Sequence, residues 1–143
     1  MAVYFYNEDY FFLPKNKTEI KKWIKIIISQ NNCLSGDINY IFTSDEQLHK
    51  MNLEYLNHDY LTDIITFDYS KNNTVNGDIF ISIERVMENA EAYHVSFGHE
   101  LKRVIIHGVL HLIGYKDKTE VESQLMRELE DKALTLIDHL VIT

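Results

Sequence analysis

The pattern of apolar and polar positions predicts strands and helices in alternation over the first half of the chain. One segment has apolar residues every three or four positions, the spacing of one helical face: Ile20, Trp23, Ile24, Ile27 and Ile28. We expect this helix over residues 18–30, with Thr18 as its N-terminal cap. Runs of β-branched and aromatic residues predict four strands, at residues 3–6, 38–43, 64–69 and 78–83.

Capping signals mark two further helices in the middle of the chain. Ser44 followed by Gln47 resembles a capping box and predicts a helix over residues 44–56. A short helix is expected over residues 84–93, directly after the last strand. The polar stretch KNNTVNG at residues 71–77 is expected to be the loop that leads into that strand.

Helices dominate the last third. A strong helix is expected from Ser96 to residue 113, with Gly114 as its C-terminal stop. Thr119 followed by Glu122 is a second capping-box pattern and predicts a final helix running towards Leu140. The whole pattern predicts an α+β fold: a small mixed sheet of about four strands packed against several helices.

Length and composition favour one domain over residues 1–143. The chain has a single proline, and no linker or internal repeat divides it. Its only cysteine, Cys33, excludes an intramolecular disulfide. No apolar run approaches the roughly 20 residues of a membrane span, and the N-terminus lacks the basic and apolar regions of a secretory signal. We expect a soluble cytoplasmic protein with no membrane partner.

Charge argues against a general nucleic-acid binder, because the net charge is −8 and phosphate contacts need Lys and Arg. The charge is uneven, however, with net +2 over residues 1–35 and −10 over the rest. A local basic surface is therefore possible around Lys21, Lys22 and Lys25. A bound cation would also add positive charge at the site of chemistry.

The chemically most informative segment is HGVLHLIGYKDK at residues 107–118. His107 and His111 are four residues apart on a predicted helix, so both imidazoles point the same way. Gly114 ends the helix, and Asp117 can then return towards the pair. Two nitrogens and one carboxylate oxygen suit Zn²⁺ and leave room for a water. The alternative is two helix histidines that face the core or a groove.

The same spacing occurs in zinc proteases of the metzincin type, which place a Glu directly after the first His as general base. That position is Gly108 here, so peptide hydrolysis by their mechanism is not expected. We expect Gly108 instead to let a neighbouring element pack close to the helix. The metal site is placed at the end of this histidine helix.

The segment HGVLHLIGY closely resembles the motif HGxLHLxGYDH of the YbeY family of bacterial rRNA-maturation endoribonucleases. Residues 56–70 resemble the family segment that ends in TDVLSF, and GDIFIS at residues 77–82 resembles its GDIxIS strand. Glu100 and Leu101 match the Glu-Leu that precedes the family's histidine helix. The resemblance spans nearly the whole chain.

The resemblance implies a cytoplasmic, metal-dependent endoribonuclease that cuts single-stranded RNA. It would act in maturation of the small-subunit (16S-type) rRNA 3′ end and in ribosome quality control, with no DNA substrate expected. One divalent ion, Zn²⁺ foremost, would be held by His107, His111 and Asp117. This chain departs from the family pattern by Asp117 in place of the third His and by Leu56 in place of an Arg.

Other residues are candidates for the reaction or for RNA binding. On the histidine helix, Arg103 could meet a phosphate and Glu100 could orient substrate, in the two catalytic roles that we assign. The candidates for substrate binding are Tyr115, Thr62, Asp63, Thr66, Lys21, Lys22 and Lys25. The alternative for each is a purely structural role at the surface, in a turn or in the wall of a groove.

The rival class of function is a non-catalytic rRNA-binding factor of ribosome assembly whose metal is structural. A closed fourth coordination position would favour that rival, and an open one in a groove would favour the enzyme. A metalloprotease ranks third because of Gly108. No residue stands out in the sequence as the general base.

Overall fold

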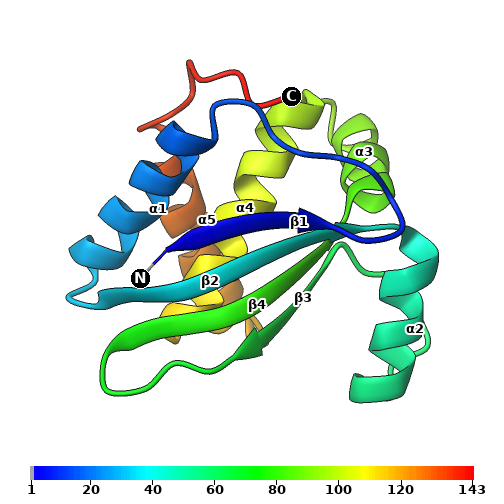
Figure 1. Cartoon of the computed structure of the whole chain (residues 1–143), viewed down its shortest axis with the longest axis horizontal. Helices are drawn as coiled ribbons and strands as arrows, with labels where there is room; N and C mark the ends of the chain where they lie inside the picture. Colours follow the sequence, from blue (N-terminus) through cyan, green and yellow to red (C-terminus); the bar gives the residue numbers. More distant parts are fainter. Residues whose placement is uncertain (1) are drawn as a thin grey trace.

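A four-stranded mixed sheet organises the protein, whose computed structural model describes residues 2–143 (Figure 1). Its strands are β1 (Val3–Asn7), β2 (Leu34–Thr43), β3 (Ile64–Asp68) and β4 (Thr74–Ser82). They lie in the order β1-β2-β4-β3. β1, β2 and β4 run parallel, and β3 is antiparallel to β4. The α+β class expected from the sequence is therefore confirmed.

Five helices occur in the described part of the chain: α1 (Lys17–Gln30), α2 (Asp45–Leu56), α3 (Ile83–Ala92), α4 (Phe97–Ile113) and α5 (Glu120–Leu134). α1 and α4 pack on one face of the sheet, and α5 lies against α4 (Figure 1). α2 lies on the opposite face, where Leu48 and Met51 form a small separate core with Ile65. None of the helices in residues 2–143 is long and apolar enough to cross a membrane.

Three of the predicted N-terminal caps are confirmed in the structure. The Ser44 side chain accepts a hydrogen bond from the Gln47 backbone N–H, and the Ser96 side chain caps α4 in the same way. Thr119 and Glu122 form a complete capping box at the start of α5. These signals work because the cap side chain bonds a backbone N–H only three residues away, whatever packs around it.

The predicted starts of three elements were wrong. α1 is preceded by Asn16, which lies in the left-handed region at φ 58°, so Thr18 is inside the helix and not its cap. β2 and β4 begin earlier than expected because the two strands pair with each other from Leu34 and Thr74 onwards. Because of this parallel pairing, most of the predicted polar loop at residues 71–77 is strand. No local sequence pattern predicts this pairing.

α5 ends at Leu134, before the predicted Leu140. The buried Lys102 of α4 donates its Nζ hydrogen bonds to the backbone oxygens of Ile137 and Asp138, at 2.9 and 3.4 Å. The indole N–H of Trp23 in α1 also bonds the Ala133 backbone oxygen, at 2.8 Å. Side chains distant in sequence thus bind the carbonyls around the end of α5, and the chain turns there.

Gly108 sets how closely α4 approaches the sheet. A Cβ at this position would lie 3.0 Å from side-chain carbons of both Ile64 in β3 and Ile79 in β4. The close packing expected of this glycine is therefore confirmed. It presses one side of α4 onto the sheet, and the side that carries the histidines is left facing α5.

Candidate metal centre

His107 and His111 bring their rings together one turn apart on α4. Their Nε2 atoms are 3.0 Å from each other. Asp117 Oδ2 is 3.2 Å from each of these two nitrogens. Gly114, at φ 126°, ends α4 and allows the chain to turn back so that Asp117 reaches the pair. Among residues 2–143, no fourth His, Cys, Asp or Glu joins this group.

The three atoms fit a tetrahedral metal ion. Zn²⁺ binds His nitrogen and carboxylate oxygen at about 2.0–2.2 Å, which places neighbouring ligand atoms about 3.3 Å apart. The triangle formed by His107, His111 and Asp117 has sides of 3.0, 3.2 and 3.2 Å. Two nitrogens and one oxygen also form a donor set that suits Zn²⁺. The residues present can therefore hold one such ion.

Hydrogen bonds at the opposite ring nitrogens orient both histidines. His107 Nδ1 is 2.6 Å from Glu130 Oε2, and His111 Nδ1 is 3.0 Å from the Tyr115 backbone oxygen. A carbonyl oxygen and a carboxylate only accept, so each neutral imidazole donates from Nδ1 and keeps the lone pair on Nε2. Both Nε2 atoms are then available as ligands, as in metal sites whose histidines are fixed from behind.

The charges around His107 favour a cation at this position. Burial by itself lowers the pKa of His107, but the hydrogen bond and charge of Glu130, together with Asp117 and Asp63, raise it above its ordinary value. The same carboxylates would stabilise a bound metal ion in place of the proton. The site therefore attracts positive charge even though its histidines are partly buried.

Glu130 is the residue of the centre that sequence reasoning missed. It comes from α5, is 5% exposed, and bonds both His107 and Arg103. A signal was present in the sequence, because Glu130 interrupts the buried stripe of α5 formed by Met126, Ala133 and Leu134. An acid in an apolar stripe needs a partner, and here the partners lie on α4.

Arg103 lies beside the centre but is already engaged. Its guanidinium forms ion pairs with Glu130 at 2.9 Å and with Asp131 at 2.7 Å, and only 12% of its side-chain surface is exposed. Arg103, Glu130 and His107 thus form a continuous chain of contacts that ends at the metal-binding triangle. The phosphate-binding role expected of Arg103 stays a prediction.

A cavity of about 680 Å³ opens between α4 and α5 beside this triangle. Five predicted site residues line this cavity: His107, Asp117, Glu100, Arg103 and Asp63.

The cavity wall also contains residues that were not predicted from the sequence, among them Tyr93, Glu120 and Arg127. Burial raises the pKa of both Asp63 and Glu100 from the ordinary value of each carboxyl group, with like charges nearby contributing. The cavity therefore combines a metal-binding corner with a desolvated acidic end.

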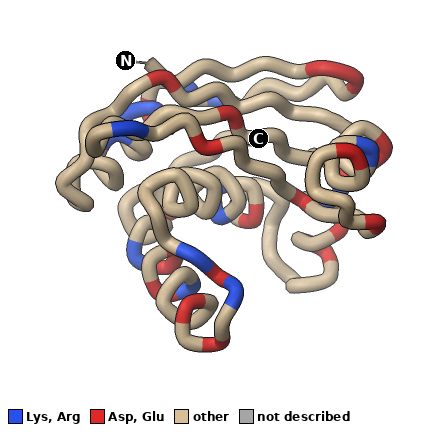
Figure 2. The backbone as a smooth tube through the Cα atoms, turned by 90° about the horizontal axis from the view of Figure 1, so that it is seen from below, with Lys and Arg blue, Asp and Glu red and all other residues tan. Residues whose placement is uncertain are grey.

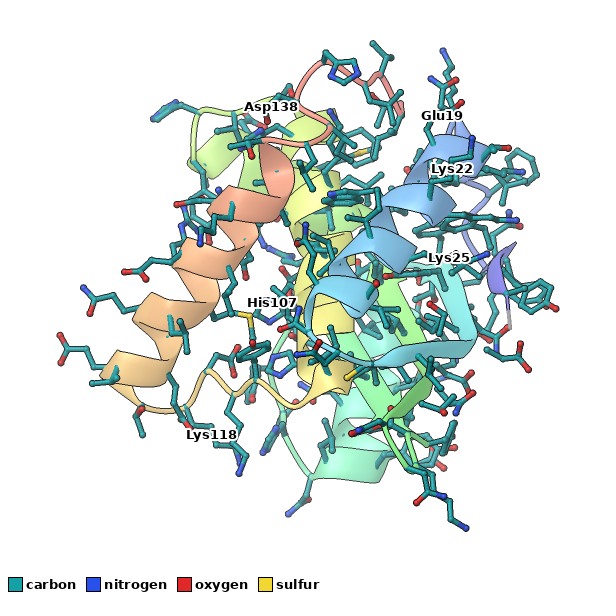
Figure 3. The ribbon with its side chains drawn as sticks, turned by 90° about the vertical axis from the view of Figure 1, so that its left-hand side faces the viewer. Glu19, Lys22, Lys25, His107, Lys118 and Asp138 are labelled. Atoms are coloured by element: carbon teal, nitrogen blue, oxygen red, sulfur yellow. The ribbon has the colours of Figure 1, made fainter. Side chains whose placement is uncertain are left out.

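The predicted substrate-binding residues are not all gathered here. Lys22 and Lys25 lie on α1, whereas His107 lies between α4 and α5 (Figure 3). Lys21 Nζ lies 5.9 Å from the centre of the Phe5 ring on β1. Among the described residues that line the cavity, none comes from α1, so any RNA contact of these lysines would extend beyond the cavity.

Tyr115, Thr62 and Thr66 also lie outside the cavity wall. The Tyr115 hydroxyl donates to Asn31 Oδ1 at 2.6 Å, which ties the loop after α4 to the end of α1. Thr62 bonds the Ile64 backbone oxygen at 3.4 Å, and Thr66 lies within β3. Their substrate roles stay predictions. Leu56, at the end of α2, is likewise not among the described residues that line the cavity.

Fold and site together define the class of protein. It is a small α+β protein in which three side chains at the edge of an open cavity could hold one metal ion. Structural zinc sites close all four positions with protein ligands, whereas catalytic sites commonly use three and leave one for water or substrate. A metal ion held by these three residues would have its fourth position open, as in catalytic sites.

Comparison with known proteins identifies the family. The model of the endoribonuclease YbeY family matches residues 6–138, and this chain belongs to that family. An endoribonuclease YbeY from Flavobacterium johnsoniae is 49% identical over 131 residues, 92% of this chain and 94% of that protein. One from Christiangramia forsetii is 51% identical over 132 residues, 92% of each chain. These relatives confirm the resemblance found in the sequence.

A solved structure supports the fold. The solution structure of a Thermotoga maritima protein has a TM-score of 0.64 and covers 96% of this chain and 92% of its own. At 23% identity this likeness concerns the fold alone.

Proposed function

We propose that this protein is a metal-dependent endoribonuclease that cuts single-stranded RNA in the bacterial cytoplasm. Its substrate is the 3′ end of 16S-type rRNA of the small ribosomal subunit, in maturation and in ribosome quality control. The observation that carries the proposal is the triangle of His107, His111 and Asp117 at the edge of the cavity. Membership of a family named for endoribonuclease activity supports the reaction class.

The metal proposed for this site is Zn²⁺. The donor set and the 3.0–3.2 Å spacing of its atoms suit this ion, and Asp117 takes the place of the third family histidine with a carboxylate that zinc also binds well. When bound, the ion supplies a water of lowered pKa and a positive charge beside the phosphodiester. Glu130 and the Tyr115 backbone oxygen hold the two histidines in position for it.

The two arginines of the cavity wall are proposed to have different roles. Arg103 fixes Glu130, and through it His107, because its guanidinium is bound by two carboxylates. Arg127 lines the same cavity with an exposed side chain and, among residues 2–143, has no ion pair. A free guanidinium is planar, permanently charged and can hold two phosphate oxygens. Arg127 is therefore the better partner for the RNA backbone, in place of the family arginine replaced by Leu56.

The remaining candidates act at a distance from the metal. Glu100 faces the cavity two turns from His107 and contacts substrate rather than metal. Lys21, Lys22 and Lys25 are proposed to meet RNA that extends over α1. Acidic and basic residues are interspersed along the backbone, including α5 and the loop before it (Figure 2). RNA binding would therefore rely on a few placed cations and the metal, and less on a broad basic surface.

The rival function, an rRNA-binding assembly factor with a structural metal, is not favoured. A structural zinc site closes its fourth position with a protein ligand, and the described residues provide three. The cavity beside the triangle gives the fourth position access to substrate. A zinc protease is disfavoured by Gly108, which stands against Ile79 where a protease has its Glu.

A cleavage assay tests the proposal. The purified, zinc-loaded protein should cut a single-stranded RNA that ends in a 16S rRNA 3′ segment, and a chelator should abolish the activity. A double-stranded RNA of the same sequence and unfolded casein serve as controls and should stay intact. Chelator-sensitive proteolysis without RNA cleavage would reverse the assignment, and chelator-insensitive RNA cleavage would remove the metal from the reaction.

A further inference from the structure

Glu100 has no polar partner although it is almost completely buried. Its side chain is 5% exposed and lines the cavity. Among residues 2–143 its carboxyl group forms no hydrogen bond or ion pair, and nearby charges act on it only at longer range. Glu130, buried to the same extent, is bound by Arg103 and His107. No buried side-chain oxygen in residues 2–143 lacks a partner, so the unpaired carboxyl oxygens of Glu100 are open to the cavity, where a ligand can bind them.

The surroundings of Glu100 define the chemistry of that ligand. Asp63 lines the same cavity, and its charge acts on Glu100 to raise the pKa further. A phosphate would be repelled by two carboxyl groups, whereas a neutral group with N–H donors would satisfy them. Tyr93, on the same wall, has an exposed ring that offers a stacking face. A nucleobase combines N–H donors with a flat aromatic surface.

The distance from the metal centre suits a nucleotide. Glu100 precedes His107 by seven residues on α4, which is about 10 Å along the helix axis. A nucleotide whose phosphate lies at the metal can extend its base about that far. The cavity of about 680 Å³ is of the size that holds a small organic ligand. Arg127 lines the same cavity with an exposed side chain and is available to the phosphate chain.

We infer that the Glu100 end of the cavity is a base-recognition subsite that prefers guanine in the nucleotide next to the cleaved bond. This inference rests on the proposed function. A carboxylate has two acceptor oxygens and no donor, and guanine presents two parallel donors, N1–H and the N2 amine, on its pairing edge. Adenine and cytosine place an acceptor beside their amine, and uracil has one N–H between two carbonyls. Guanine therefore satisfies both oxygens of Glu100, and the other bases satisfy one.

Removing one amino group from the RNA base tests the subsite without altering the protein. Single-stranded RNAs with one guanosine or one inosine at the same place differ only in the N2 amine. The zinc-loaded parent protein should cut next to guanosine about 10-fold faster or more, the scale of one hydrogen bond to a charged group. Binding of GMP and IMP to the same protein, measured by calorimetry, should show the same preference.

A variant and a matched control locate the effect. Glu100→Gln presents one acceptor and one donor and should abolish the preference for guanosine over inosine while the zinc content stays at the parent's value. Glu120→Gln, on the exposed rim of the same cavity, should keep the preference. Equal cleavage of guanosine and inosine RNAs by the parent, with equal binding of GMP and IMP, would overturn the inference.

The failure of the proposed function would be seen separately. If the zinc-loaded protein cuts no RNA, the proposed endoribonuclease activity is wrong. The binding of GMP and IMP then tests the base-recognition subsite independently of cleavage. A Glu100-dependent preference for GMP would keep it as a purine-binding site. Equal binding of the two nucleotides would remove it together with the function.

Discussion

The two ends of the cavity differ in how completely their polar groups are paired. At the end formed by His107, His111 and Asp117, every ring nitrogen has a partner and the ligand atoms converge on one point. Two turns away along α4, Glu100 is more enclosed than these three residues, but its carboxyl group has no partner among residues 2–143. The difference separates a site assembled in advance for an ion from one that is completed only by a ligand.

The presence or absence of polar partners also shows which buried charges are unfavourable in the folded state. Burial raises the pKa of Asp63 and Glu100, so their charged forms are disfavoured in the folded state. At the metal end, Arg103 neutralises Glu130 directly. Natural proteins keep such unsatisfied groups mainly where function requires them, since elsewhere apolar replacements are more stable. The difference between the two ends can be tested by substitutions, beginning with the metal ligands and ending with Glu100.

The largest effect is expected at the metal ligands. His107→Ala should lower bound metal well below one ion per chain, because His111 and Asp117 alone form a poor zinc site. Elemental analysis after dialysis measures the occupancy. His49→Ala is the control, since His49 lies on α2, across the sheet from the centre, is only partly buried and pairs with Asp59. Unchanged occupancy in His107→Ala would exclude the site.

Two variants at Asp117 sharpen this prediction. Asp117→His should retain the metal, because it restores the third family histidine. Asp117→Asn should weaken binding, since a neutral amide is a poor zinc ligand. If the Asn variant binds as much metal as the parent, Asp117 does not coordinate.

The next largest effect is expected at Arg127. Arg127→Ala should slow RNA cleavage by about 10²-fold, on the scale of one lost charge-stabilising group, and added zinc should not restore it. Arg103→Ala should also slow cleavage, but excess zinc should recover part of the activity, because Arg103 acts through Glu130 and His107. Single-turnover rates at two zinc concentrations separate the two. Full activity in Arg127→Ala with an unrecoverable Arg103→Ala would assign the phosphate to Arg103.

A smaller effect is expected behind the metal ligands. Glu130→Gln keeps the shape of the side chain but removes the charge that Arg103 and His107 share. Zinc affinity should fall by about 10- to 100-fold, as for other residues that orient a ligating histidine. Competition with a chromophoric chelator measures the affinity, and Glu128→Gln, exposed on the same helix, is the matched control. An unaltered affinity would show that the bond to Glu130 does not tune the centre.

The smallest effect is expected at the acidic end, in the pH dependence of stability. The folded pKa of Glu100 is raised, so its contribution to stability is full below the unfolded pKa near 4.3 and is lost as pH rises through the folded value. Glu100→Gln should therefore lose less stability than the parent between about pH 4 and pH 7. Urea unfolding of both metal-free proteins across this range measures the difference. Parallel pH profiles would contradict the unfavourable burial of the Glu100 charge.

Features that depend on residues a few positions apart could be predicted from the sequence. A helix places residues four apart on one face, so the spacing of His107 and His111 already fixed their common direction. Gly114 allowed the reversal that returns Asp117, and Ser44, Ser96 and Thr119 marked helix starts. Each of these contacts has nearly the same geometry in any fold, because the local backbone alone sets it.

Contacts between distant segments could be found only in the folded structure. Glu130 reaches His107 across 23 residues because α5 packs against α4, and that packing also gives Arg103 its two carboxylate partners. Pairing of β2 with β4 extended both strands, and Lys102 binds carbonyls just beyond the end of α5. The paired and unpaired ends of the cavity follow from the same packing. Such contacts depend on how whole elements pack, because burial and long-range pairing outweigh the local preferences that sequence patterns report.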